Sequence, residues 1–181
     1  MNFLPSITIV TPSLNAAATI KQTLDSVATQ SYPGQIEHIV IDGGSTDGTL
    51  DVVREAGVPY VSEADRGLTH ALNKGIDLSH SEIFAQLNAD DFYFPSALIA
   101  AGEAFAAHPE QEWLTGRCVI VDADGHEIRR FVTLYKNLLL RHWSLPLHLS
   151  QNFVSAPTTF VRTSALRDIG GYDERFSHSM D

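Results

Sequence analysis

The stretch Ile83-Phe84-Ala85-Gln86-Leu87-Asn88-Ala89-Asp90-Asp91 joins an apolar segment directly to two adjacent carboxylates. The apolar part predicts a buried strand, because a short apolar run bounded by polar residues is typical of a strand covered on both faces. Two neighbouring anions resist burial unless a cation or the hydroxyls of a ligand compensate them. Ligands bind at the carboxyl ends of the strands in open α/β sheets, so this run predicts a ligand site. A turn with a helix cap ahead of Pro95 is the alternative.

The first 108 residues alternate between signals for strands and signals for helices. Short apolar and β-branched runs predict strands at residues 7–10, 36–41, 58–61 and 83–87. Apolar residues at helical spacing predict helices that begin at Ile20 and near Leu50, and two more over residues 68–78 and 96–107. Strands that alternate with helices form a mostly parallel sheet through right-handed crossovers, so we expect an α/β fold with helices flanking the sheet.

The pattern changes after Pro109. Residues 119–121 and 127–131 predict a β-hairpin, residues 158–161 another strand, and residues 163–168 a short helix. The tract from Lys136 to Ser155 has mixed periodicity. We interpret it as an acceptor-binding or membrane-proximal loop, with a packed irregular segment as the alternative. The second half of the chain therefore predicts a smaller antiparallel addition to the parallel sheet.

The composition limits the class of protein and of partner. A chain of 181 residues with 44% hydrophobic residues predicts one globular domain. The net charge of −10 argues against nonspecific binding to nucleic acid or anionic membranes, although a divalent cation can make one cleft attractive to a phosphorylated ligand. The single cysteine, Cys118, lies in an apolar run, which predicts a core residue and a reducing, cytoplasmic location. We find no signal peptide and no stretch of roughly 20 apolar residues that could span a bilayer.

Polar groups follow each predicted strand of the first half. They are Thr11-Pro12-Ser13 after the first strand, Asp42 after the second, Glu63, Asp65 and Arg66 after the third, and Asp90-Asp91 after the fourth. If these strands are parallel, all of the groups project at one edge of the sheet, and we expect the separated aspartates to share one pocket.

Two of these groups have competing interpretations. Asp42 precedes two glycines, so it is expected to be a buried carboxylate that accepts a hydrogen bond from a base, with a loop cap as the alternative. Asp47 is expected to cap the next helix. Arg66 suits a phosphate or a carboxylate ligand, and its alternative is a surface ion pair with Asp65 or Glu63. The loop over residues 42–48 has neither the glycine spacing of a phosphate-cradling loop nor that of a dinucleotide fingerprint.

Four ordered motifs resemble glycosyltransferase family 2. They are Ile7–Asn15 (ITIVTPSLN), Ile39–Thr49 (IVIDGGSTDGT), Glu63–Gly75 (EADRGLTHALNKG) and Leu87–Asp91 (LNADD), with a similar tail over Thr159–Asp181. The resemblance runs from about Ser6 to the end of the chain. It implies the GT-A fold, a Rossmann-like α/β fold, in a single catalytic domain over residues 1–181. Residues 1–108 would be its nucleotide-binding half, and residues 109–181 the start of an acceptor-binding half whose C-terminal part is missing.

The resemblance also implies a role for each matching residue. Thr11, Pro12, Asn15, Asp42, Asp65, Arg66, Lys74 and Asp90 match positions that bind the nucleotide sugar, with Asp42 on the nucleobase and Asp90 near the ribose. Asp91 matches the ligand of Mn²⁺ or Mg²⁺, and Asp181 matches the general base. The implied reaction is an inverting, hexosyltransferase-like transfer from a nucleoside-diphosphate sugar, with a UDP-sugar favoured, to a saccharide or lipid-linked saccharide. Cell-surface polysaccharide or lipopolysaccharide assembly is the implied pathway, in the cytoplasm or at the inner face of the plasma membrane.

Three departures from the family pattern modify this expectation. His70 stands where relatives often carry an acidic residue, and Ser179-Met180-Asp181 lacks the first carboxylate of the base motif. The sequence stops at Asp181, where relatives continue, so we expect donor binding with slow transfer or none, because chain ends fray. One alternative is a nucleotidyltransferase, which Thr11–Asn15 disfavours because it has no basic residue. The other is a non-catalytic module that binds nucleotide sugars.

Overall fold

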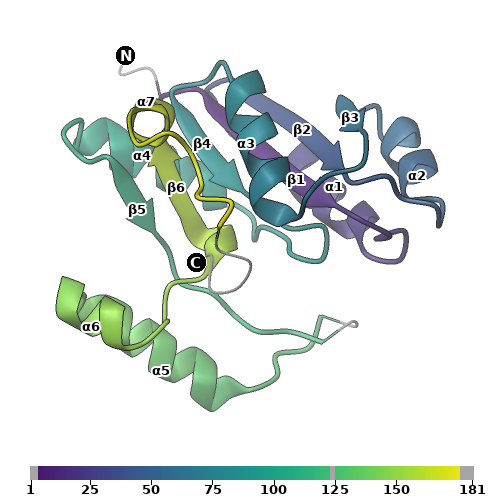
Figure 1. Ribbon diagram of the computed structural model, residues 1–181. Helices are drawn as coiled ribbons and strands as arrows, with labels where there is room; N and C mark the ends of the chain where they lie inside the picture. The colour runs from purple at the N-terminus through teal and green to yellow at the C-terminus, as the bar shows by residue number, and fades with distance from the viewer. Residues whose placement is uncertain (1–3, 123–124, 176–181) are drawn as a thin grey trace.

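The computed structural model describes residues 4–122 and 125–175. In that part of the chain, six strands form one sheet in the order β3-β2-β1-β4-β6-β5 (Figure 1). They are β1 (Ile7–Ser13), β2 (Ile36–Asp42), β3 (Tyr60–Ser62), β4 (Ile83–Gln86), β5 (Trp113–Thr115) and β6 (Thr159–Arg162). β1 pairs in parallel with β2 and β4, and β2 with β3, whereas β6 runs antiparallel to β4 and β5. The predicted parallel sheet with a smaller antiparallel addition is confirmed.

Helices cover both faces of the sheet. α1 (Ile20–Ala28), α2 (Thr49–Glu55) and α4 (Ala97–Ala107) pack on one face, and α3 (Leu68–Leu78) and α7 (Thr163–Asp168) on the other (Figure 1). Alternate residues of one strand serve the two sides: Ile9 packs with α1 and α4, whereas its neighbour Val10 packs with α3. Both are fully buried. This double coverage explains why every residue of β1 and β4 is buried.

The close packing of α3 against β1 depends on one glycine, Gly75. A Cβ atom on Gly75 would lie 2.5 and 2.6 Å from the two methyl carbons of Val10. The absence of a side chain at Gly75 therefore sets how closely α3 approaches the sheet, and with it the position of the loop that precedes α3.

The second half departs from the expected pattern in three places. The hairpin over residues 119–131 is only partly formed: an antiparallel bridge pairs Val121 with Glu127, and the Ile128 amide donates to the Ile120 carbonyl over 2.8 Å, but Arg130 already begins a helix. Strand β5 was not predicted, because three residues are too few to show a period of two. Residues 136–155 are largely helical rather than a loop, forming the end of α5 (Arg130–Arg141) and α6 (Leu145–Ser150), before a single 3₁₀ turn (Ala156–Thr158). Both α5 and α6 lie apart from the sheet (Figure 1).

Among the described residues, no helix is long and apolar enough to cross a membrane.

Candidate functional site

Asp42 lies at the carboxyl end of β2, where its side chain is completely buried. Ser13 and Ser45 donate their hydroxyls to Oδ1, the former over 3.1 Å. The Ser62 hydroxyl donates to Oδ2 over 2.7 Å, and the amides of Gly44 and Ser45 donate to the same oxygen over 3.0 and 2.9 Å. One carboxylate thus joins the ends of β1, β2 and β3, as the parallel arrangement predicts.

These contacts decide the charge of Asp42. Burial acts to raise the pKa of this carboxyl, but the hydrogen bonds from Ser45, Ser62 and Gly44 together outweigh it and leave the pKa below its ordinary value. In the described part of the chain, hydrogen bonds rather than a counter-cation therefore keep Asp42 ionised at neutral pH. The sequence analysis missed Ser45 and Ser62. The pattern that could have indicated them is a serine just after the two glycines that follow Asp42, and a second serine at the end of the next strand.

The loop after β2 is fastened to the end of β1. The Asn15 amide donates to Ser45 Oγ over 2.8 Å, and Asn15 Oδ1 accepts the Thr46 amide over 2.9 Å. Asn15 has φ 51°, a left-handed conformation that asparagine tolerates. Asp47 accepts the amides of Ala17 and Thr49, both over 3.0 Å, so it holds the start of α2 from the position before the N-cap. Asn15 and Asp47 thus shape the loop mainly through backbone contacts.

Thr11 and Pro12 are buried in β1. The Thr11 hydroxyl lies 2.9 Å from His38 Nε2 on β2. Burial lowers the pKa of His38 to about 4, so the ring is neutral and the pair is a hydrogen bond between uncharged groups.

The loop after β3 packs against the loop after β2. A Cβ atom on Gly43 would lie 2.8 Å from Asp65 Oδ2, which accounts for a glycine at that position. Asp65 Oδ1 accepts the Gly67 amide over 2.9 Å, just before α3 begins. Asp42 and Asp65 therefore belong to the same edge of the sheet, on adjacent loops.

Basic residues near this edge are paired with glutamates. Arg66 donates from Nε and from one terminal nitrogen to Glu174, over 3.0 and 2.7 Å. The alternative prediction for Arg66, an ion pair with Asp65 or Glu63, is wrong, because Arg66 pairs with Glu174. Lys74 Nζ lies 2.8 Å from Glu63 Oε1, and this ion pair lowers the pKa of Glu63. His70 Nδ1 accepts the Arg66 amide over 3.2 Å. The histidine that replaces the acidic residue of many relatives therefore supports the loop between β3 and α3.

The Asp90-Asp91 turn follows β4 and is braced from two sides. Asn88 Nδ2 donates to Asp91 Oδ2 over 3.1 Å, and the Thr23 hydroxyl of α1 donates to the Asp91 carbonyl over 2.7 Å. Gln86 donates to Asn88 Oδ1 over 2.8 Å, which fixes the amide that reaches Asp91. The Asp90 side chain is exposed, whereas Asp91 is half-buried. The predicted strand-end position of both carboxylates is confirmed.

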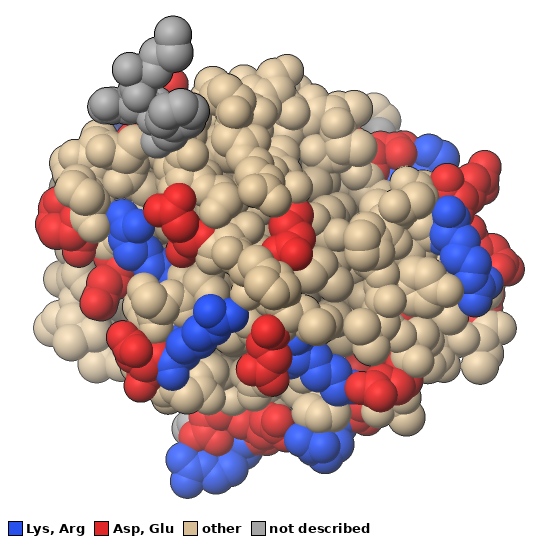
Figure 2. Space-filling view, turned by 90° about the horizontal axis from the view of Figure 1, so that it is seen from above, with Lys and Arg blue, Asp and Glu red and all other residues tan. Residues whose placement is uncertain are grey.

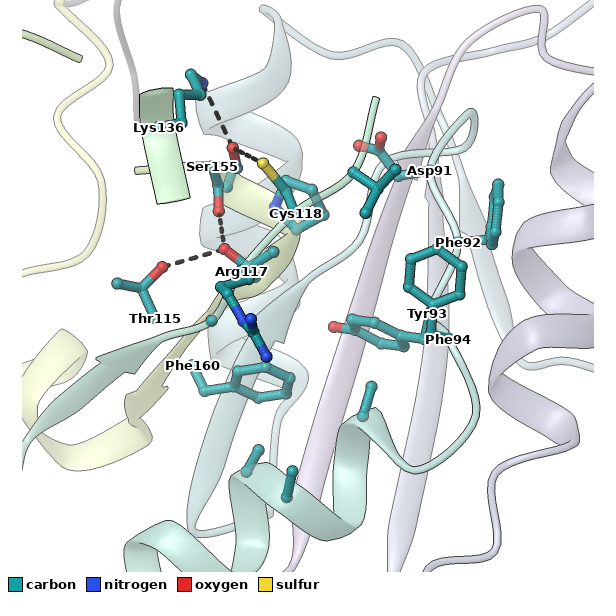
Figure 3. A pocket seen from close by; sticks show the side chains of 18 of the residues that line it. Asp91, Phe92, Tyr93, Phe94, Thr115, Arg117, Cys118, Lys136, Ser155 and Phe160 are labelled. Carbon is teal, nitrogen blue, oxygen red and sulfur yellow. Dashed lines mark hydrogen bonds between the residues drawn. The ribbon is translucent and has the colours of Figure 1, made fainter. Parts of the chain in front are cut away.

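Both carboxylates line a cavity of about 1020 Å³ (Figure 3). Its walls come from the segment after β4, one face of α4, and the chain from β5 through residue 121. Cys118 lies in this wall rather than in the core: it is half-buried, and its Sγ accepts the Ser155 hydroxyl over 3.2 Å. The part of α5 that carries Lys136 and Asn137 completes the lining.

The structure gathers the predicted residues into two groups. Asn15, Asp42 and Asp65 lie on adjoining loops, and Arg66 and Lys74 flank them, but none of these lines the cavity that holds Asp90 and Asp91. Strand β1 separates β2 from β4 at this edge. The aspartates therefore share a sheet edge, with Asp90 and Asp91 at the cavity and Asp42 and Asp65 on the loops across β1 from it. Asp181 lies outside the described residues.

The described residues contain no cluster of three or more histidine, cysteine or acidic side chains that could hold a metal ion. Asp90 and Asp91 nevertheless have suitable chemistry, because Mg²⁺ and similar cations are bound by one or two carboxylates together with the phosphates of a substrate. The site fits a cation that arrives with a diphosphate rather than one held by the protein alone.

Charge on the molecule's surface is mixed on the face seen from above. Figure 2 shows Lys and Arg side chains interspersed with Asp and Glu around the margin, and a largely uncharged centre. The net charge of −10 is therefore not gathered into one acidic patch on this face.

Comparison with known proteins places these features in a family. Residues 8–167 match the family described as Glycosyl transferase family 2. An uncharacterised glycosyltransferase of Mycobacterium tuberculosis is 32% identical over 186 residues, which cover all of this chain and 68% of that protein. Two solved structures share the fold. One is a mannosyltransferase of Pyrobaculum calidifontis in complex with GDP-Man and Mn²⁺ (TM-score 0.73, 23% identity, 95% of this chain), and the other is S. aureus TarS 1-349 in complex with UDP (TM-score 0.72, 22% identity, 97%). The chain spans 48% and 52% of these two structures, respectively.

Proposed function

The chain belongs to glycosyl transferase family 2 and is a glycosyltransferase, and from this we propose that it transfers a sugar from a nucleoside-diphosphate sugar to an acceptor hydroxyl with inversion at the anomeric carbon. The observation that carries the proposal is the Asp90-Asp91 turn. Two carboxylates stand at the end of a buried parallel strand, braced by Asn88 and Thr23, and both face a cavity large enough for a substrate.

The proposed cofactor is Mn²⁺ or Mg²⁺, with Asp91 as its protein ligand and Asp90 near the donor. When bound, such a cation offsets the negative charge that develops on the departing diphosphate. Asn88 donates to one Asp91 oxygen and so helps to fix the direction of this carboxylate. The cation in the GDP-Man complex of the Pyrobaculum protein supports this choice.

We propose that the nucleotide lies over the loops that follow β1, β2 and β3. Thr11 and Pro12 form the floor of this surface, and Asn15 and Asp65 hold its loops. Asp42 would accept a base N–H in exchange for the hydrogen bond from Ser45, since its carboxylate is otherwise fully engaged. Arg66 and Lys74 would turn from their glutamate partners toward the diphosphate.

For the acceptor side, Asp181 is the proposed general base, because an acceptor hydroxyl needs a carboxylate within hydrogen-bonding reach. A single displacement then needs no enzyme nucleophile. We propose residues 1–108 as the nucleotide-binding half and residues 109–181 as the beginning of the acceptor-binding half. A UDP-sugar donor and a saccharide or lipid-linked saccharide acceptor are proposed, with cell-surface polysaccharide assembly as the pathway. The UDP complex of TarS supports the choice of base.

We also propose that the protein works in the cytoplasm, attached peripherally to an anionic membrane through α5. Residues 128–167 contain no acidic residue and six of the chain's 12 Lys and Arg residues. Phe131, Leu134 and Leu138 form an apolar stripe on α5 at helical spacing, and they are 90%, 71% and 53% exposed. A helix with exposed apolar side chains beside basic ones suits a lipid interface, even in a chain of negative net charge.

The proposed function is tested by calorimetric titration of the protein with UDP and GDP, each with Mn²⁺ and with EDTA. We expect binding that requires the cation, and a loss of at least about tenfold in affinity for Asp91→Asn. Asp77→Asn, an exposed site on α3, is the matched control and should bind like the wild type. Binding that is equal with and without the cation would reject the metal role. Binding without any sugar transfer, tested with UDP-sugars and acceptors by anomeric NMR of the product, would favour the non-catalytic module.

A further inference from the structure

One side of the cavity beside Asp90 and Asp91 does not suit a diphosphate or a sugar. Ala97, Ala101 and Ala104 stand on one face of α4 at helical spacing and present only methyl groups to it. Two aromatic rings pack in the same cluster as Ala97 and Ala101: those of Tyr93 and Phe160, which stack with centroids 5.9 Å apart and planes 21° from parallel. A polar group placed against this side would lose its water without gaining hydrogen bonds from it.

One polar atom inside this apolar region has no partner among the described residues. The Tyr93 side chain is more than nine-tenths buried, and its hydroxyl makes no hydrogen bond there. Figure 3 shows the hydroxyl end of the ring pointing toward the side of the cavity where Phe160 lies. A buried hydroxyl without a partner is costly, so its position indicates an atom that is supplied from outside the chain.

Polar groups lie on another side of the same cavity. Lys136 Nζ is 3.4 Å from the Ser155 hydroxyl, and this hydroxyl donates to Cys118 Sγ over 3.2 Å (Figure 3). The cavity therefore has an apolar region around Tyr93 and α4, a polar side at Lys136 and Ser155, and the two aspartates at its edge. A ligand that fits all three has both an apolar and a polar part.

From this arrangement we infer that the cavity binds the apolar aglycone of the acceptor, an aromatic ring or short alkyl group, with Tyr93 hydrogen-bonded to the oxygen that joins it to the polar part. The inference rests on the proposed function and names its acceptor class. The volume of about 1020 Å³ is at the upper end of the range for ligands of drug size, so a saccharide with a phenyl or hexyl aglycone can be enclosed. Burial of apolar area against the alanines and aromatic rings supplies the affinity.

The test measures binding of three glucosides that differ only in the aglycone: methyl, phenyl and hexyl β-D-glucoside. NMR titration of the wild-type protein should show the phenyl and hexyl compounds binding at least about tenfold more tightly than the methyl compound, since each buried methylene group contributes roughly a fourfold gain. Equal affinity for all three would overturn the inference.

Two variants locate the effect. Ala104→Leu narrows the cavity and should remove most of the preference for phenyl and hexyl aglycones, whereas Ala107→Leu, exposed on the same helix, should keep it. Tyr93→Phe keeps the ring stack and should fold at least as stably as the wild type, but bind phenyl β-D-glucoside several-fold more weakly. If neither Ala104→Leu nor Tyr93→Phe changes the preference, the aglycone binds elsewhere and the inference fails.

A separate measurement distinguishes this inference from the proposed function. Ala104→Leu should bind UDP with Mn²⁺ as the wild type does, because α4 does not contribute to the nucleotide loops. If the wild type does not bind UDP with Mn²⁺, the proposed function is rejected, and the aglycone preference can still be measured. Normal UDP binding with no aglycone preference would reject only the inference.

Discussion

Asn73 on α3 holds Tyr172 by both of its backbone polar groups: Oδ1 accepts the Tyr172 amide over 2.8 Å, and Nδ2 donates to the Tyr172 carbonyl over 2.9 Å. The two residues are 99 positions apart in the chain. A Cβ atom on Gly171 would lie 2.6 Å from Asn73 Oδ1, so a glycine is required where this turn meets the helix. The contact fixes the turn at residues 170–172 beside the loop that carries Arg66.

Asn73→Ala should destabilise the protein, because it leaves two backbone groups of a half-buried turn without partners. We expect a loss of about 1–3 kcal/mol in the free energy of unfolding, measured by urea denaturation. Hydrogen exchange at residues 170–174 should rise at the same time. Asp77→Ala, on an exposed position of the same helix, is the control and should stay within about 0.5 kcal/mol of the wild type. Unchanged exchange in Asn73→Ala would contradict the role assigned to this side chain.

Asp42→Asn should also destabilise the protein without any ligand. The substitution replaces an acceptor by an amide that faces donors from Ser45, Gly44 and Ser62, and we expect a loss of about 2 kcal/mol or more. Because the folded pKa of Asp42 lies below its ordinary value, its contribution is present above about pH 4 and decreases as the pH falls further. Asp51→Asn removes a carboxylate that is 80% exposed and should have little effect. Equal stability of both variants would mean that Asp42 is not structural.

His38 should make stability depend on pH in a higher window. Its pKa falls from 6.5 to about 4 on folding, so the unfolded chain binds more protons between these values. Stability is therefore complete above about pH 6.5 and decreases toward pH 4, with a loss of roughly 2 kcal/mol between about pH 7 and pH 5. His38→Gln keeps an amide near the Thr11 hydroxyl and should flatten this dependence in urea titrations. A slope that is the same in the variant would assign the titration to another group.

Gly75→Ala should destabilise the protein, although alanine is normally better than glycine inside a helix by about 1 kcal/mol. The added methyl group would meet the Val10 side chain, and we expect a net loss of about 1–3 kcal/mol. Val10→Ala should partly rescue Gly75→Ala in a double-mutant cycle, because the two residues are in direct contact. A stabilised Gly75→Ala variant would show that α3 does not approach β1 this closely.

Membrane attachment through α5 predicts that the protein sediments with anionic phosphatidylglycerol vesicles and much less with phosphatidylcholine vesicles. Replacing Phe131, Leu134 and Leu138 by serine should abolish sedimentation, since the apolar stripe supplies the buried area. Ile169→Ser removes a side chain that is 76% exposed elsewhere and serves as the control. If the wild type is a dimer in solution that the triple variant makes monomeric, a second copy covers the stripe and the membrane proposal is wrong.

The sequence by itself determined the parallel part of the fold, because its signals are local. Apolar runs that end in polar residues identified β1, β2 and β4, and helical spacing identified α3 over its full length. The parallel order then requires that Asp42 and Asp90 stand at one edge of the sheet. These conclusions need only the periods of a strand and a helix and the direction of the crossovers.

The tertiary structure alone decided what each of these residues contacts. Glu174 pairs with Arg66 across 108 positions, and the cavity beside Asp91 forms where α4, β5 and α5 meet, a combination that no local pattern records. The hairpin expected over residues 119–131 is shorter than predicted: Val121 pairs with Glu127, but from Arg130 the chain forms a helix. Propensity and periodicity are properties of neighbouring residues, whereas pairing, burial and cavities depend on which distant segments the folded chain brings together.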